Sequence, residues 1–154
     1  MKRVAALALL ALAAAGCGGS HSAKQPTADP KKAAVNVVAM IVHNRYTQAW
    51  DTLHSSDQKV APRNEYVACE QRSPITSPPS SVKVLRVTHE SVGLGDGTFV
   101  PSTAVAVRLG FPGGFHADQT VHLVAEDGTW KWILPAQKYR EYKANTCPGT
   151  GGAA

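Results

Sequence analysis

Apolar residues recur with two different periods along this chain, helical in its first half and alternating in its second. The first helical stripe begins after Asp29, a good N-cap residue, and Pro30, which suits the first helical position. Asn44 is expected to end this helix. Its apolar positions lie three or four residues apart, and they are Ala34, Val35, Val38, Ile41 and Val42.

Two shorter helices are predicted next. One runs from Tyr46 to about His54, and the other starts at Pro62, with a turn capped by Asp57 between them. Residues 73–81 contain three prolines and four serines, which predicts an extended surface connection.

From residue 82 onward the apolar residues alternate with polar ones, as in strands with one buried face. Pro101 cannot donate to a strand ladder, so we expect a sheet edge or a bulge there. The predicted strands cover residues 82–92, 98–109, 115–126 and 129–134, and a short helix follows over 136–143. The plan is therefore α+β, with three N-terminal helices, a four-stranded antiparallel meander and a short C-terminal helix.

The first 17 residues have the pattern of an export signal. Lys2 and Arg3 precede an apolar run over residues 4–15, which spans about 18 Å as a helix, against about 30 Å for a bilayer core. Two routes remain open. Cleavage after the alanines at 13–15 would release a soluble protein. Alternatively, small residues followed by Cys17 resemble the bacterial lipobox, in which the cysteine is acylated, for example with palmitate, and becomes the first residue.

The cysteine count favours the second route. The chain has three cysteines, Cys17, Cys69 and Cys147, and ordinary cleavage would leave an odd thiol in an oxidising compartment. Lipidation uses Cys17 and leaves an even pair, which we predict to form a disulfide. A bond between Cys69 and Cys147 would close a long loop, and in the chain-entropy model such a disulfide stabilises the fold by at most about 4–5 kcal/mol. Two separately buried thiols are the alternative.

These assignments divide the chain into four parts. They are a signal peptide over 1–16, a flexible tether over 17–29, one α+β domain over 30–148 and a disordered tail over 149–154. Losing Lys2 and Arg3 lowers the formal net charge from +5 to +3. This modest surplus suits an anionic membrane surface, and its scattered distribution argues against a nucleic-acid partner.

The order of the predicted elements and three sequence segments resemble a known family. The segments are 46–53 (YTQAWDTL), 66–69 (YVAC) and 126–132 (EDGTWKW). They are similar to small actinobacterial lipoproteins of the nuclear-transport-factor-2-like (NTF2-like) superfamily, whose cone fold is shared with ketosteroid isomerase and SnoaL-type cyclases. The resemblance covers about residues 30–148. It implies a curved sheet, a cystatin-like roll, that wraps a long helix and leaves an apolar pocket, and it carries over no catalytic residue.

Four side chains are candidates for lining that pocket: Trp50, Tyr66, His89 and His122. The alternative for Trp50 is a core anchor, and for the histidines a satisfied position in the core or at the rim. His116 and His122 share a strand face but lie about 20 Å apart along one strand, too far to bind one metal ion. We therefore expect no metal and no cofactor.

Two classes of function follow from these observations. The first is an exported, non-catalytic binding or adaptor module, held at the cell membrane or envelope by lipid on Cys17, that contacts an envelope protein or a small apolar ligand. The alternative is a small isomerase, dehydratase or cyclase, which would need His89 or His122 in a closed cavity. A regulatory partner of a cell-wall enzyme is a third possibility.

Overall fold

The structure is a computed structural model that describes residues 24–149. The predicted signal peptide, Cys17 and most of the predicted tail lie outside the described residues. Among residues 24–149, no helix combines the length and the apolar composition that crossing a membrane requires.

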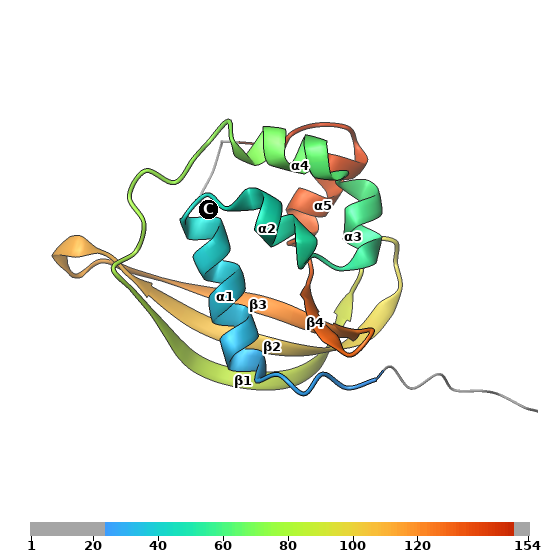
Figure 1. The fold of residues 1–154 in the computed structure, drawn as a ribbon, viewed down its shortest axis with the longest axis horizontal. Helices are drawn as coiled ribbons and strands as arrows, with labels where there is room; N and C mark the ends of the chain where they lie inside the picture. Colours follow the sequence, from blue (N-terminus) through green and yellow to red (C-terminus); the bar gives the residue numbers. More distant parts are fainter. Residues whose placement is uncertain (1–23, 150–154) are drawn as a thin grey trace, which may run out of the picture.

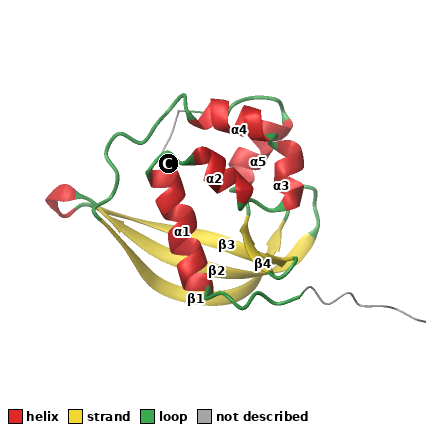
Figure 2. Ribbon diagram, in the orientation of Figure 1, coloured by secondary structure: helices red, strands yellow, loops and turns green. Residues whose placement is uncertain are grey.

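Four helices precede the sheet and one follows it (Figures 1 and 2). The second helix ends at Asp51, earlier than expected, and an additional short helix replaces the predicted turn. His54 caps this helix, because its side chain accepts from the backbone N–H of Ser56, whereas Asp57 is buried. The helices are α1 Pro30–Val42, α2 Tyr46–Asp51, α3 Ser55–Val60, α4 Arg63–Glu70 and α5 Ala136–Lys143.

The sheet is an antiparallel meander in the order β1-β2-β3-β4, as the sequence predicts. Its strands are β1 Ser81–Gly93, β2 Phe99–Gly110, β3 His116–Glu126 and β4 Thr129–Trp132. Pro101 lies opposite Ser91 of β1, and pairing with β3 begins only at Thr103, so its missing N–H faces an unpaired edge. The bulge lies elsewhere, between Val84 and Arg86 of β1.

Helix α1 lies across one face of the curved sheet, and the remaining helices gather at one side of it (Figure 1). The apolar stripe of α1 packs on the alternating residues of the sheet, and Val105 and Val107 of β2 are fully buried there. The predicted α+β class is confirmed.

A disulfide fastens the last described residues to the helical layer. Cys69 at the end of α4 is bonded to Cys147, 78 residues later, with 5.2 Å between their Cα atoms. Next to it, Glu70 accepts hydrogen bonds from Lys138 Nζ at 2.6 and 2.8 Å and from the Tyr142 hydroxyl at 3.0 Å. The predicted cysteine pairing is therefore present, and it joins α4 to the segment that follows α5.

A second fastening point is the buried carboxylate of Asp57, which is 2% exposed. Its Oδ2 accepts from the backbone N–H of Leu134, 2.7 Å away, and so ties α3 to the segment between β4 and α5. Burial raises the pKa of Asp57, and the Leu134 N–H and nearby His54 offset only part of that rise.

We expect the double substitution Cys69→Ser/Cys147→Ser to lower the free energy of unfolding by about 3–4 kcal/mol, because it restores chain entropy to the unfolded state. Urea denaturation of the oxidised wild type and the variant measures this difference. Wild-type protein kept reduced is the control and should match the variant. Equal midpoints for all three would contradict the prediction.

Asp57 should make stability depend on pH. Because its pKa is raised in the folded state, protonation favours folding. Its contribution is therefore fully present below the unfolded-state pKa and is lost as the pH rises through the folded-state pKa. Urea denaturation at several pH values should show the wild type gaining stability relative to Asp57→Asn as the pH falls. A flat or reversed difference curve would show that Asp57 does not carry this dependence.

Candidate functional site

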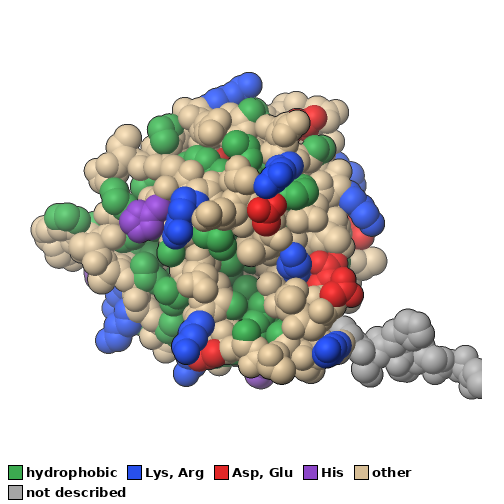
Figure 3. Space-filling model, viewed as in Figure 1, with side chains coloured by type: hydrophobic (Ala, Val, Ile, Leu, Met, Phe, Trp, Pro, Cys, Tyr) green, Lys and Arg blue, Asp and Glu red, His purple; other side chains and the backbone are tan. Residues whose placement is uncertain are grey.

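An apolar pocket of about 330 Å³ lies between the C-terminal half of α1 and the sheet. Figure 3 shows apolar side chains gathered in hollows on this face of the molecule. Two polar residues, Gln119 and Thr120, line the pocket, and no charged residue does. Gln119 lies opposite Val107 and so shares the sheet face that α1 covers, whereas the side chain of Thr120, opposite Ala106, lies on the other face. The apolar lining residues are Val37, Val38, Ile41, Val42, Ile75, Pro79, Leu109, Phe111, Val121, Trp132, Ile133 and Pro135.

Two walls of the pocket follow from the amphipathic patterns of the sequence. Val38 and Val42 of α1 are buried. Ile41, about one turn after Val38, is partly exposed and also lines the cavity. On the sheet, Leu109 of β2 lies opposite Ala117, two positions from Gln119 along β3. The helix stripe and the strand alternation therefore supply these walls directly.

Another wall comes from the proline-rich connection before β1, and Asn44 holds it in place. Asn44 has φ +56°, a left-handed conformation that asparagine tolerates better than most residues. Its side-chain amide pairs with the backbone of Ile75 through hydrogen bonds of 3.0 and 2.8 Å. The buried Tyr46 hydroxyl donates to the same Asn44 oxygen at 2.6 Å. These contacts fix Ile75 over the pocket.

Two of the four candidate side chains lie in the helical layer, away from the apolar pocket. Tyr66 is 1% exposed, and its ring lies 5.9 Å from that of Tyr142. Burial raises the pKa of Tyr66, so its hydroxyl stays neutral. Trp50 packs against the core, and its indole N–H donates to the Ala61 carbonyl at 2.7 Å. Both contacts are those of core anchors.

The two candidate histidines lie on opposite faces of the sheet, and neither lines the apolar pocket. His89 is exposed on the face that α1 covers, and its Nδ1 lies 3.2 Å from the Thr103 hydroxyl. It lines a separate, open cleft. His122 is on the other face, with Nδ1 3.3 Å from Glu90 Oε1 but without hydrogen-bond geometry. The structure therefore does not bring the two histidines together.

Asp118 lies between His116 and His122 on the same face of β3, but its carboxylate is paired with an arginine. Asp118 is held by two hydrogen bonds of 2.7 Å from Arg108, which lower the pKa of Asp118 and raise that of Arg108. Within residues 24–149, no three His, Cys, Asp or Glu side chains lie close enough to share an ion.

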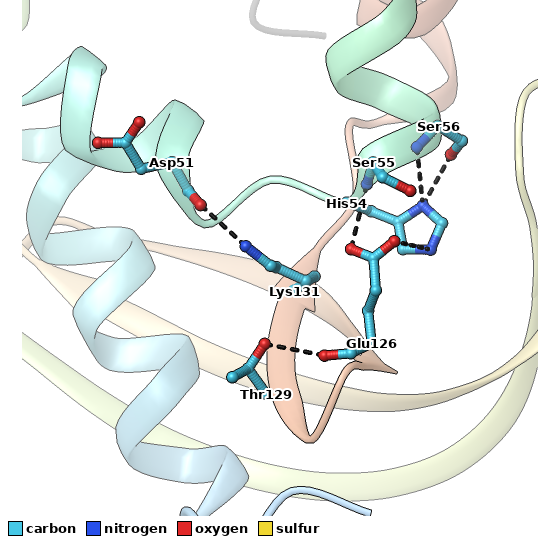
Figure 4. A network of polar contacts seen from close by, with 7 residues as sticks. All are labelled: Asp51, His54, Ser55, Ser56, Glu126, Thr129 and Lys131. Carbon is cyan, nitrogen blue, oxygen red and sulfur yellow. Dashed lines mark hydrogen bonds and ion pairs between the residues drawn. The ribbon is translucent and has the colours of Figure 1, made fainter. Parts of the chain in front are cut away.

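A polar network with catalytic residue types joins the α2–α3 linker to the β3–β4 hairpin (Figure 4). Ser56 Oγ lies 2.8 Å from His54 Nδ1, and His54 Nε2 lies 3.7 Å from Glu126 Oε1. His54 Nδ1 also accepts from the Ser56 backbone N–H at 3.3 Å, while Glu126 accepts from the Ser55 N–H. None of them lines the apolar pocket. The network caps α3 and fastens it to the hairpin.

The sequence predicted that Val38, Ile41 and Val42 lie on an apolar helix face. It assigned Ile75 and Pro79 to a surface connection, although both line the pocket, and it did not identify the polar positions. Gln119 and Thr120 stand next to each other on β3, and no pattern in the sequence marks them. Asn44 was expected only to end α1, although its left-handed conformation also directs its amide toward Ile75. That second role depends on a residue 31 positions away.

Asn44 allows a test of how the pocket wall is held. In both Asn44→Gly and Asn44→Ala, the Ile75 amide should exchange with solvent at least tenfold faster than in the wild type, because its acceptor is gone. Asn44→Ala should also lose about 1 kcal/mol of stability relative to Asn44→Gly, since alanine disfavours positive φ. Hydrogen exchange and urea denaturation measure the two effects. Full protection of Ile75 in Asn44→Gly would show that the amide does not hold this segment.

Comparison with known proteins supports the architecture. No protein-family model matches this sequence, and no curated protein does. Among solved structures, the chain is similar to a Campylobacter jejuni protein described as a proposed NTF2-like transpeptidase. The two are 14% identical, with a TM-score of 0.50, and the match covers 70% of this chain and 100% of that chain. At this identity the likeness extends to the fold alone: the chain has an NTF2-like fold.

Proposed function

We propose that this protein is an exported, lipid-anchored binding module of the cell envelope that has no catalytic activity. Its partner is a small apolar ligand, or an envelope protein that presents an apolar group to the pocket. The anchor is an acylated Cys17, as in the small lipoproteins that the sequence resembles.

The observation that carries the proposal is the chemistry of the pocket. Its volume of about 330 Å³ is at the lower end of the range for small-molecule sites, and its lining residues are apolar apart from Gln119 and Thr120, which are neutral. A charged ligand group would lose its hydration there without gaining a partner. The Gln119 side chain can orient one polar end of an otherwise apolar molecule.

The same lining argues against the alternative of a small isomerase, dehydratase or cyclase. Such an enzyme needs a general base and a donor for the developing oxyanion within reach of one substrate. Among the described residues, no carboxylate, histidine or lysine lines the apolar pocket. His89 and His122, the two candidates for a base, lie at an open cleft and on the opposite face of the sheet.

The anchor is proposed from the sequence. Cys17 lies outside the described residues, but the Cys69–Cys147 disulfide leaves it as the remaining cysteine of the three. A disulfide indicates an oxidising compartment, which fits an exported protein. Acyl chains on Cys17 would then give stable attachment to a membrane.

The pocket should bind N-phenyl-1-naphthylamine, an uncharged apolar dye, in a saturable manner. Val121→Phe on the sheet side and Ile41→Phe on the helix side each add a ring inside the cavity and should weaken dye binding about tenfold, or about 1.4 kcal/mol. Fluorescence titration measures the dissociation constants.

Leu85→Phe is the matched control, because it adds the same ring at a residue that is 42% exposed and outside the pocket. It should leave dye affinity unchanged. Absence of saturable binding in the wild type, or equal affinity in all four proteins, would contradict the apolar-ligand proposal.

A further inference from the structure

Residues 24–29, which precede α1, lie against the β3–β4 hairpin, and we call them the strap. The indole N–H of Trp130 donates to the Ala28 carbonyl at 2.7 Å. The Lys24 side chain lies over Gly128, so closely that a Cβ added there would be 3.2 Å from Lys24 Cδ. Trp130 also lines the open clefts that contain Gln25 and Thr27. The strap is therefore packed on the domain before the first helix begins.

The strap and the β2–β3 turn lie at opposite ends of the molecule. The apolar pocket lies between them, because Val37 lines both this pocket and the cleft that contains Ala28, whereas Phe111, next to the β2–β3 turn, lines the pocket from the other side. Strand β2 runs between the same two ends, and its 12 residues span about 40 Å. In Figure 1 the strap, in blue, lies at the right, whereas the β2–β3 turn lies at the far left.

The length of chain between the lipid and the strap decides how the domain can turn. Seven residue steps separate Cys17 from Lys24, and a fully extended chain of that length reaches about 25 Å. If the strap were free, the first fixed residue would be Pro30, 13 steps from Cys17, with a reach of about 45 Å. Only the longer reach exceeds the 40 Å length of the sheet.

We infer that the strap, docked on Trp130, holds the hairpin end of the domain at the bilayer surface and keeps the β2–β3 turn farther from it. The inference rests on the proposed anchor at Cys17. With a reach of 25 Å, shorter than the 40 Å sheet, the domain cannot turn over so that only the β2–β3 turn meets the membrane.

The orientation can be measured on the full mature protein bound to phosphatidylcholine–phosphatidylglycerol vesicles that contain a headgroup nitroxide lipid. A bimane label is attached to a cysteine introduced as Thr129→Cys in the hairpin or as His116→Cys beside the β2–β3 turn. Quenching should be at least threefold stronger at position 129 than at position 116. Equal quenching, or stronger quenching at 116, would overturn the inference.

Further variants test whether docking of the strap, rather than the shape of the domain, sets this orientation. Six Gly/Ser residues inserted between Ser22 and Ala23 restore the longer reach without altering the folded domain, so the quenching ratio should fall toward one. The same insertion after Gly149 is the matched control and should leave the ratio unchanged. Trp130→Ala should also lower the quenching ratio toward one. A Trp130→Ala protein that folds and keeps the wild-type ratio would contradict the role of the strap.

Failure of the anchor and failure of the strap give different results. If Cys17→Ser protein binds vesicles as well as the wild type does, the proposed anchor is wrong. Strap docking is read on the same mature chain from the exchange rate of the Trp130 indole proton. This proton should exchange at least tenfold more slowly than in a variant whose residues 24–28 are replaced by Gly and Ser. Equal rates would overturn the inference whatever the state of Cys17.

Discussion

The packing of α1 against the curved sheet is the contact on which the rest of this structure depends. Ala34 is fully buried near the start of the helix, and its small side chain lets the helix approach the sheet closely there. Val37, Val38 and Val42 continue the contact, and burial of each contributes about 1.5–3 kcal/mol. Toward the C-terminal end of α1 the packing is incomplete, and the space left is the apolar pocket. The pocket is thus the unfilled end of the main core contact.

The three tryptophans join this core to the segments around it. Each has a ring packed on or within the core and an indole N–H that donates to a backbone carbonyl elsewhere in the chain. Trp50 bonds to Ala61, Trp132 to Ala49 and Trp130 to Ala28, and the last of these holds the strap. Because each ring is fixed by packing, the carbonyl that it binds is fixed as well. Together they position the helical layer and the entry of the chain relative to the sheet.

The hydrogen-bonded polar side chains and the apolar pocket occupy different parts of the molecule. Its hydrogen-bonded polar side chains, such as Asp57, Asn44 and Glu70, bind backbone or other side chains and fasten segments together. The lining of the apolar pocket contains none of these three residues and no charged residue. In the described part of the chain, these polar contacts therefore hold the fold together, and the pocket remains apolar.

The sequence alone determined the order and type of most elements, because helical and alternating periods are local properties. The cysteine count, together with the predicted export signal, indicated the Cys69–Cys147 bond, since an even pair in an oxidising compartment is expected to form a disulfide. Only the tertiary structure decided which apolar residues face a cavity rather than the core. It also decided that Asn44 holds Ile75 and that Trp130 holds the strap. Those contacts join positions far apart in the chain, and their geometry follows from how α1 crosses the sheet, which no local pattern encodes.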